Sequence, residues 1–252
     1  MLKQICIIAV LISSAGGFAN AGLRVEPARQ EITLKPGGTF DGSYRVTNDL
    51  GKTTDISVET RYWYVSKEEE ENVKVSDWLT VTPSSFTFKQ GESVDVRYSV
   101  KMSTHVTGTR VVMVTFVPGG QEGVTLVVSV SLYVTMQGTQ KIEWDFSKFR
   151  LTSYQGTAQF SVDVGNTGNV HVRPSGYVEV KYKKKKAKIL NILEGRPVYP
   201  SQSRQVIAQG QLKEIFPKFG KYKVRVSLTS GDITKEKNYD VQIKKTGEVI
   251  IK

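Results

Sequence analysis

Cysteine and histidine are scarce in this 252-residue chain, which has one cysteine, Cys6, and two histidines, His105 and His171. Cys6 lies in an apolar N-terminal segment, so a mature chain without that segment has no thiol and forms no disulfide bond. The histidines are far apart in the sequence, and neither has the closely spaced partner of a typical zinc site. Gly-x-Ser-x-Gly, phosphate-loop and dinucleotide motifs are absent as well. We therefore expect no enzyme, no metal site and no cofactor.

Long apolar runs are also lacking, apart from a short one near the N-terminus. Lys3 precedes the apolar segment Ile5–Ile12, and the triplet Ala19-Asn20-Ala21 follows it. A basic start, a short apolar run and a small-x-small triplet are typical of a cleaved secretory signal peptide, and this run is too short to span a bilayer. We predict a signal peptide over residues 1–21 and a mature protein in the periplasm, with an extracellular location as the alternative. We do not expect an integral membrane protein.

Helical periodicity is nearly absent, and apolar and polar residues instead alternate with a period of two. The alternating segments recur through the whole mature chain and are separated by turn signals rich in glycine, asparagine and proline. They cover residues 22–34, 42–48, 54–65, 93–102, 109–117, 124–134, 157–166, 175–182, 186–193, 204–212, 221–229 and 237–245. Short strands with frequent turns predict an all-β protein of the sandwich type.

The two halves of the mature chain repeat one order of segments. A strand that ends in asparagine comes early in each half, at Tyr44–Asn48 and at Phe160–Asn169. A strand that follows a glycine comes late in each half, after Gly108 and from Gly220. This repeat predicts two immunoglobulin-like β-sandwich domains in tandem. We place them at residues 22–138 and 139–252.

The chain is basic, with a formal net charge of +11. The densest basic patch is expected at a hairpin tip and consists of Lys181, Lys183, Lys184, Lys185, Lys186 and Lys188. Lysines at such a tip deter edge-to-edge pairing of sheets and aid solubility. An anionic envelope surface or an acidic partner is the alternative, whereas nucleic acid is not expected for an exported protein. The acidic segment Lys67–Asn72 is expected to be a solvated loop.

One predicted strand, residues 124–134, stands out because both of its faces are largely apolar or small. Its even positions are Val124, Leu126, Val128, Val130, Leu132 and Val134. Neither lysine nor proline interrupts the strand, although an exposed edge without such residues is prone to aggregation. We therefore predict that this edge is covered by another protein, which adds a strand to it.

Several segments resemble, in their order, the N-terminal domain of periplasmic chaperones of pilus assembly, the PapD-like proteins. They are residues 22–48, 77–100, 108–117 and 124–134, and the second half resembles the second domain of the same chaperones. This resemblance implies that the last strand of the first domain is donated to an incomplete pilus subunit. It also implies that an arginine of the first strand and a lysine of the donated strand anchor the terminal carboxylate of the subunit.

Arg24 matches the arginine of that family, but no lysine matches the second anchor, and the equivalent position falls near Ser131. The predicted partner-binding residues are thus Arg24, Val124, Leu126, Val128, Val130, Ser131, Leu132 and Val134. We expect a chaperone-like binding protein that engages an exported, pilus-type subunit by strand addition. The alternative is a structural or adhesive exported protein of the cell envelope without chaperone activity.

Overall fold

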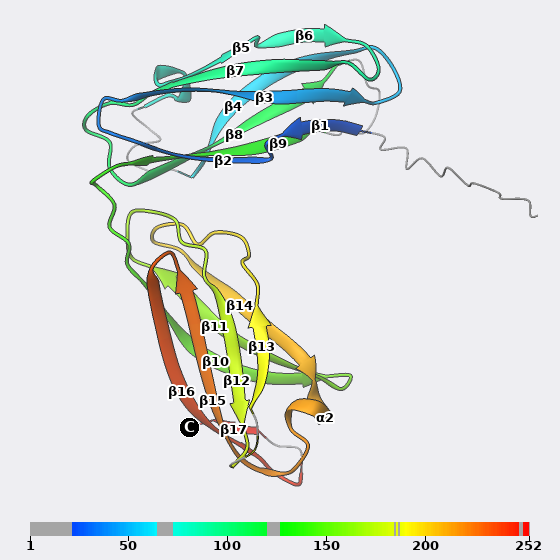
Figure 1. Ribbon diagram of the computed structural model, residues 1–252, viewed down its shortest axis with the longest axis vertical. Helices are drawn as coiled ribbons and strands as arrows, with labels where there is room; N and C mark the ends of the chain where they lie inside the picture. Colours follow the sequence, from blue (N-terminus) through cyan, green and yellow to red (C-terminus); the bar gives the residue numbers. More distant parts are fainter. Residues whose placement is uncertain are drawn as a thin grey trace, which may run out of the picture.

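The fold consists of two β-sandwiches that follow one another along the chain (Figure 1). The computed structural model describes residues 22–64, 73–119, 127–183, 185, 187–246 and 249–251. The predicted signal peptide and the acidic segment Lys67–Asn72 lie outside the described residues. The all-β prediction with two sandwiches in tandem is confirmed.

The first sandwich contains the strands β1 to β9. Their bounds are β1 Gly22–Glu26, β2 Arg29–Leu34, β3 Thr39–Asp49, β4 Thr54–Tyr64, β5 Leu79–Thr82, β6 Ser85–Phe88, β7 Ser93–Lys101, β8 Thr109–Pro118 and β9 Val128–Met136. A turn of 3₁₀ helix, η1 (Val75–Asp77), precedes β5. One sheet has the strand order β1-β3-β7-β5, and the other has the order β2-β9-β8-β4-β6.

The second sandwich contains the strands β10 to β17. Their bounds are β10 Trp144–Tyr154, β11 Thr157–Asn166, β12 Ser175–Lys181, β13 Lys188–Ile192, β14 Ser203–Gln211, β15 Gly220–Ser230, β16 Ile233–Ile243 and β17 Val249–Ile251. A single helical turn, α2 (Leu212–Ile215), follows β14. The sheet orders are β10-β11-β14 and β13-β12-β15-β16-β17. The predicted boundary after residue 138 falls between β9 and β10, and we retain it as a proposal.

Each sandwich has its own core, built from the inward-facing residues of its two sheets. Tyr44 and Phe116 are fully buried in the first core, and Phe146 and Phe160 are fully buried in the second. Burial of one such side chain stabilises a fold by about 1.5–3 kcal/mol. Because no disulfide bond is expected, these cores are the main source of stability.

The predicted internal repeat extends to individual hydrogen bonds. Asn48 ends its run of buried residues in β3, and its side-chain amide donates to the carbonyls of Lys52 and Phe88. Asn166 ends β11, and its amide donates in the same way to the carbonyls of Val170 and Val198. In each case the side-chain oxygen accepts from the backbone N–H two residues later. Both asparagines are therefore structural residues that fix the turn after their strand.

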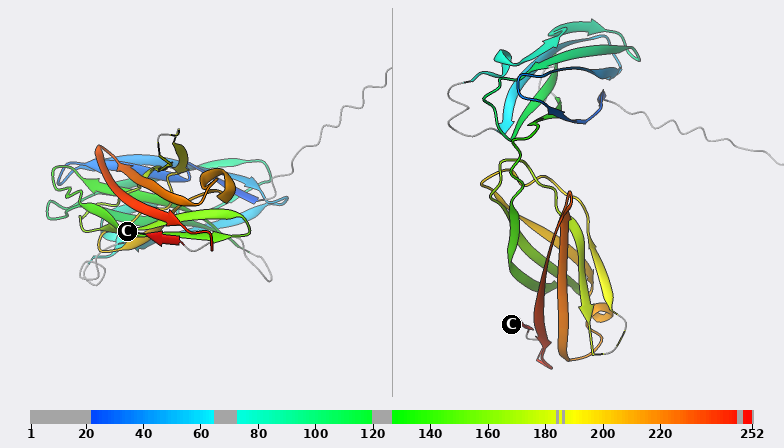
Figure 2. Two further views of the ribbon diagram at one scale, coloured as in Figure 1. Left: turned by 90° about the horizontal axis from the view of Figure 1, so that it is seen from below. Right: turned by 60° about the vertical axis from the view of Figure 1, so that its left-hand side comes forward.

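The two domains are joined by a close backbone contact and not by a loose linker. The N–H of Thr109 donates to the carbonyl of Asn169, and the amide of Asn169 donates to the carbonyl of Thr139. A Cβ atom on Gly108 would lie 2.1 Å from that Asn169 carbonyl oxygen, so no side chain fits there. Figure 2 shows that the long axes of the two domains run in different directions, so the molecule is bent at this junction.

Candidate functional site

The predicted binding strand contains β9, which lies in the larger sheet of the first domain. On one side β9 pairs antiparallel with β8 along almost its whole length. On the other side it pairs in parallel with β2, but only over Ser131–Met136. Within the described residues, Val128–Val130 is the part of β9 whose second side has no strand partner. The expectation of an open edge as far as Val134 is wrong, because β2 closes the edge from Ser131 onward.

The even positions of β9 point into the sandwich. Val130, Leu132 and Val134 are buried, with exposed fractions of 1%, 0% and 0%. They pack in the core of the first domain. The prediction that these three side chains bind a partner is therefore corrected. They fill the core of their own domain, and a partner would reach them only if the sandwich opened.

The side chains at the N-terminal end of β9 are less buried. Val128 is half-buried, and Val127, immediately before the strand, is 49% exposed. Val124 and Leu126 lie outside the described residues, so their contribution to binding stays a prediction.

The backbone of Ser129 faces the open side of β9. The N–H of Ser131 donates to the carbonyl of Ala28 at 3.3 Å, so it points toward the opening segment of the chain. Backbone polar groups of alternate residues point to the same side of a strand. The N–H and C=O of Ser129 therefore face that side too, and no described strand pairs with them there. Ser129 offers one donor and one acceptor to an added strand.

Arg24 lies in a different sheet from Ser131. It is part of β1, opposite Thr47 of β3, whereas β9 belongs to the other sheet. Its side chain is exposed, and its Nε lies 3.8 Å from a carboxylate oxygen of Asp49. The neighbouring Val25 is buried, so Arg24 points away from the core. The predicted anchor of Arg24 opposite Ser131 is therefore wrong.

A second arginine of the opening segment, Arg29, lies where Arg24 was expected. Arg29 is the first residue of β2 and is directly opposite Ser131, so it marks the point where the closed part of β9 begins. The sequence signal for this arrangement is Pro27, because proline has no N–H and interrupts sheet pairing. The prediction of one strand over residues 22–34 is wrong, since β1 and β2 lie in different sheets on either side of the proline.

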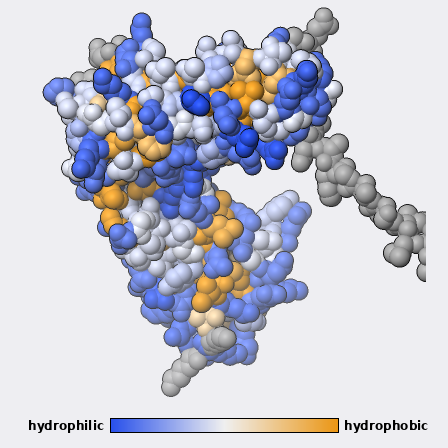
Figure 3. Space-filling view, turned by 45° about the horizontal axis from the view of Figure 1, so that its top comes forward, coloured by the Kyte–Doolittle hydropathy of each residue, from blue (hydrophilic) through white to orange (hydrophobic). Residues whose placement is uncertain are grey.

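Arg29 belongs to a polar cluster between the domains, which we call the junction cluster. It consists of Arg29, Glu31 and Tyr133 from the first domain and His171, Arg173 and Glu194 from the second. Arg29 Nη1 donates to Glu194 Oε1 at 3.4 Å, and Arg29 Nε lies 3.3 Å from Glu31 Oε1. In Figure 3, hydrophilic residues gather in the corner where the two domains meet. Ion pairs between charged side chains thus connect the two domains at the end of the open edge.

Arg173 enters the junction cluster from the second domain and is largely enclosed. Its side chain is 13% exposed, and its Cζ lies 5.0 Å from the centre of the Tyr133 ring. Its Nη2 lies 3.5 Å from Glu31 Oε1, which Arg29 also contacts. The guanidinium is therefore held by stacking on β9 and by attraction to a carboxylate.

His171 adds a neutral ring to the junction cluster. Its ring centre lies 4.5 Å from that of Tyr133, and its Nε2 lies 3.7 Å from Glu31 Oε2. Burial lowers the pKa of His171 to about 4; Glu31 acts in the opposite direction, and Arg173 and Arg29 lower the pKa further. His171 is therefore neutral at pH 7, and the charges of two arginines and two glutamates cancel.

Tyrosines pack beside the junction cluster and hold the second domain against β4 and β9. The hydroxyl oxygens of Tyr133 and Tyr199 are 3.2 Å apart. The ring of Tyr199 stacks on that of Tyr64 at 4.8 Å, and the Tyr64 hydroxyl donates to the carbonyl of Pro200. Burial raises the pKa of Tyr199, so its hydroxyl keeps its proton at neutral pH. Because Arg173 stacks on the ring of Tyr133, these contacts position Arg173 beside β9.

The predicted basic patch lies at the end of the second domain that is far from the junction. The antiparallel pairing of β12 with β13 confirms the hairpin that was expected there. Of its lysines, Lys181, Lys183, Lys185 and Lys188 are exposed. Lys184 and Lys186 lie outside the described residues.

The candidate site consists of the open strand edge at Ser129 and the charged side chain of Arg29 beside it. Such an arrangement suits the addition of a strand. Ser129 supplies backbone groups for sheet pairing, and Arg29 supplies a half-exposed cation at the end of the open edge. In the part of the chain that the structure describes, no three acidic, histidine or cysteine side chains are grouped to hold a metal ion. No described helix has the length and apolar character needed to cross a membrane.

No protein-family model and no curated protein matches this chain. Solved structures do match it. A chain of the chaperone–tip adhesin complex of CFA/I fimbriae biogenesis is 15% identical, with a TM-score of 0.46, and the match covers 92% of this chain and 99% of that one. The CupB2 chaperone of Pseudomonas aeruginosa is 12% identical, with a TM-score of 0.47, over 86% of this chain and 98% of that one.

A third match is a chain of the CsuC–CsuE chaperone–tip adhesion subunit pre-assembly complex from the archaic chaperone-usher Csu pili of Acinetobacter baumannii. It is 11% identical, with a TM-score of 0.43, over 86% of this chain and 98% of that one. Many of the matched structures are pilus chaperones. The resemblance predicted from the sequence is confirmed in these matches. The identities are low and the TM-scores lie below 0.5, so these matches show a likeness of fold alone.

Proposed function

We propose that this chain is a periplasmic chaperone-like protein that holds an exported, pilus-type subunit by adding a strand of the subunit to the open part of β9. The observation that carries the proposal is the edge itself, which is open at Val128–Val130 and closed from Ser131 onward by β2. An added strand would continue the line of β2 along β9 and would pair with the backbone of Ser129. One end of that strand would then lie beside Arg29.

Arg29 is the residue to which we assign the anchoring of the subunit's terminal carboxylate. The resemblance to pilus chaperones implies an arginine of the opening segment in this role. Arg29 supports the assignment because it faces Ser131 at the end of the open edge, whereas Arg24 lies in the other sheet. The Arg29 side chain is 48% exposed, so an incoming carboxylate can replace Glu194 as its partner.

Replacement of Ser129 by proline tests the strand addition. We expect Ser129→Pro to weaken capture of the partner about tenfold or more, because it removes the N–H that faces the open edge and places a ring there. The pairing of β9 with β8 should survive, since that N–H does not point toward β8. Capture is measured by pull-down from a periplasmic extract with the tagged mature chain, together with the melting temperature of each variant.

Ser129→Ala is the matched control, because it removes the hydroxyl and keeps the backbone donor. Normal capture by Ser129→Ala and weak capture by Ser129→Pro support strand addition. Equal capture by both variants would refute it and would favour a structural or adhesive protein. Hydrogen exchange gives an independent readout, since the Ser129 amide should become protected only when the partner is bound.

The pair Arg29→Ala and Arg24→Ala tests the anchor. We expect Arg29→Ala to weaken partner binding by about 1.5–3 kcal/mol, the range for hydrogen bonds to charged groups, and Arg24→Ala to have little effect. Affinities are measured by calorimetry with a synthetic peptide of the captured partner's C-terminal sequence. Amidation of the peptide should weaken its binding to the parent chain and not to Arg29→Ala. If Arg24→Ala shows the larger loss, the assignment to Arg29 is wrong.

A further inference from the structure

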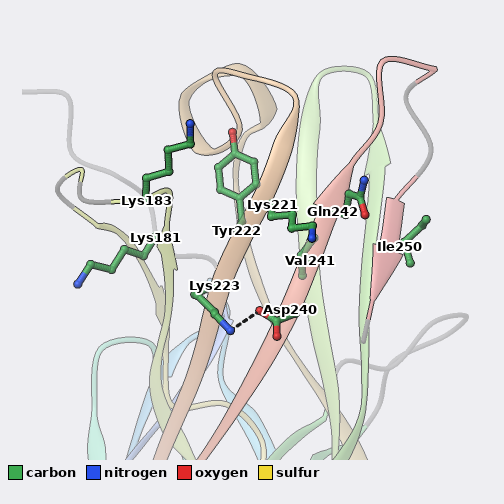
Figure 4. A pocket seen from close by; sticks show the side chains of 9 residues that line it. All are labelled: Lys181, Lys183, Lys221, Tyr222, Lys223, Asp240, Val241, Gln242 and Ile250. Carbon is green, nitrogen blue, oxygen red and sulfur yellow. Dashed lines mark ion pairs between the residues drawn. The ribbon is translucent and has the colours of Figure 1, made fainter.

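A cavity of about 450 Å³ lies at the end of the second domain that is far from the junction (Figure 1). Figure 4 shows the side chains that line it. It is formed by the end of β12 and by parts of β15, β16 and β17. Its charged lining consists of Lys181, Lys183, Lys221, Lys223 and Asp240. We call it the lysine groove. Four cations and one carboxylate thus line a space large enough for a small ligand.

The charges of the lysine groove are not balanced within the described chain. Lys223 Nζ lies 2.6 Å from Asp240 Oδ1, so this pair is neutral. Lys181 is directly opposite Lys223 in the sheet, an arrangement of like charges that destabilises strand pairing. Lys181 and Lys221 form no ion pair with any described residue. Lys183 Nζ lies 5.5 Å from the centre of the Tyr182 ring and also lacks a described carboxylate partner.

Protection of a sheet edge does not explain these lysines. Edge protection requires charges on the outermost strand of a sheet. Lys221 and Lys223 are on β15, which lies between β12 and β16 in the sheet order. Lys181 ends β12, which is also not an outermost strand, and it is opposite Lys223 without a partner in β13. Edge protection therefore does not account for Lys221 and Lys223, and the gathering of four lysines around one cavity favours an external anion.

Apolar side chains accompany the lysines at this end of the domain. Phe219 immediately precedes β15 and is 57% exposed, with Lys218 and Lys221 close to it in the sequence. Ile250 of β17 lines the groove, and the next residue, Ile251, is 36% exposed. Exposed apolar side chains among lysines are typical of proteins that lie on an anionic membrane, where the apolar groups enter below the headgroups. An acidic polysaccharide would offer no apolar region to the aliphatic side chains of Ile250 and Ile251.

From this combination we infer that the lysine groove and Phe219 bind the surface of an anionic phospholipid membrane. The lysines Lys181, Lys183 and Lys221 contact lipid phosphates, and Phe219 inserts between the headgroups. This inference is independent of strand addition, because the lysine groove and β9 are at different ends of the molecule.

The test compares two triple variants of the full mature chain that lose the same charge. One is Lys181→Ser with Lys183→Ser and Lys221→Ser, and the other replaces the exposed lysines Lys35, Lys89 and Lys101 of the first domain by serine. Both are mixed with vesicles of phosphatidylglycerol and phosphatidylcholine, and bound protein is measured by co-sedimentation. At low salt we expect the groove variant to bind roughly a hundredfold more weakly than the parent, at about 1 kcal/mol for each lysine near the surface.

The variant that lacks Lys35, Lys89 and Lys101 should keep most of the parent's affinity for the mixed vesicles. Vesicles of phosphatidylcholine alone should bind the parent weakly, and added salt should weaken binding to the mixed vesicles. Phe219→Ser should lower the affinity without changing the net charge. If the two triple variants lost vesicle affinity equally, binding would depend only on overall charge, and the inference would be overturned. Binding to polyphosphate with no binding to vesicles would overturn the assignment to lipid.

Discussion

Replacement of Leu132 by aspartate is expected to leave the first domain unfolded. The Leu132 side chain is fully buried between the sheets. Loss of its apolar contacts costs about 2–5 kcal/mol, and burial of an unpaired carboxylate costs several kcal/mol more. Together these losses approach the whole stability of an ordinary domain, about 5–15 kcal/mol. The loss of the cooperative thermal transition of this domain, followed by calorimetry, measures the effect.

Val128→Asp is the control for Leu132→Asp, because Val128 is only half-buried at the start of the same strand. It should lower the melting temperature without abolishing the transition. A folded Leu132→Asp variant would contradict the position of Leu132 in the core. The comparison also affects the design of binding experiments, since a loss of partner capture by Leu132→Asp would report unfolding and not the removal of a binding residue.

Replacement of Asn166 by alanine is expected to destabilise the second domain by about 3 kcal/mol or more. The change removes the two hydrogen bonds to the carbonyls of Val170 and Val198 and the one from the N–H of Gly168. A buried polar group that is left without its partner costs about 1–3 kcal/mol. Urea unfolding, read by hydrogen exchange of peptides from β11 and β15, measures the loss.

Asn48→Ala is the matched variant in the first domain, where the side chain forms the same three kinds of hydrogen bond. Each variant should destabilise its own domain more than the other. If both variants lost less than 1 kcal/mol of unfolding free energy, water would replace the asparagine amide at little cost. The repeated asparagines would then not be structural residues. Equal destabilisation of both domains by one variant would show that they unfold together.

The fold could be read from the sequence because alternation with a period of two is local. Each of the segments around Val96, Val162 and Val226 shows which residues face the core, without reference to the rest of the chain. The repeated asparagines Asn48 and Asn166 also carried a correct signal, since each is the last buried residue of its strand, at the corresponding place in its domain. Local patterns of this kind depend on the geometry of one strand and its turn.

The candidate site was harder to predict because it depends on which strands become neighbours. The alternation in residues 124–134 shows two faces, but it does not show that β2 covers one edge from Ser131 onward. That coverage follows from the change of sheet at Pro27, a single residue inside a segment that otherwise reads as one strand. His171, Arg173 and Glu194 come from the second domain, and no sequence spacing relates them to Arg29.

The glycine at position 108 limits how this molecule can change over evolutionary time. A side chain there would collide with the Asn169 carbonyl oxygen of the other domain, and the backbone also adopts a left-handed conformation, with φ of +68°. A related sequence that keeps the bend between the domains is therefore expected to keep this glycine. A descendant sequence that lost this glycine would have to rebuild the angle between the domains, even if both sandwiches and every residue of the open edge were retained.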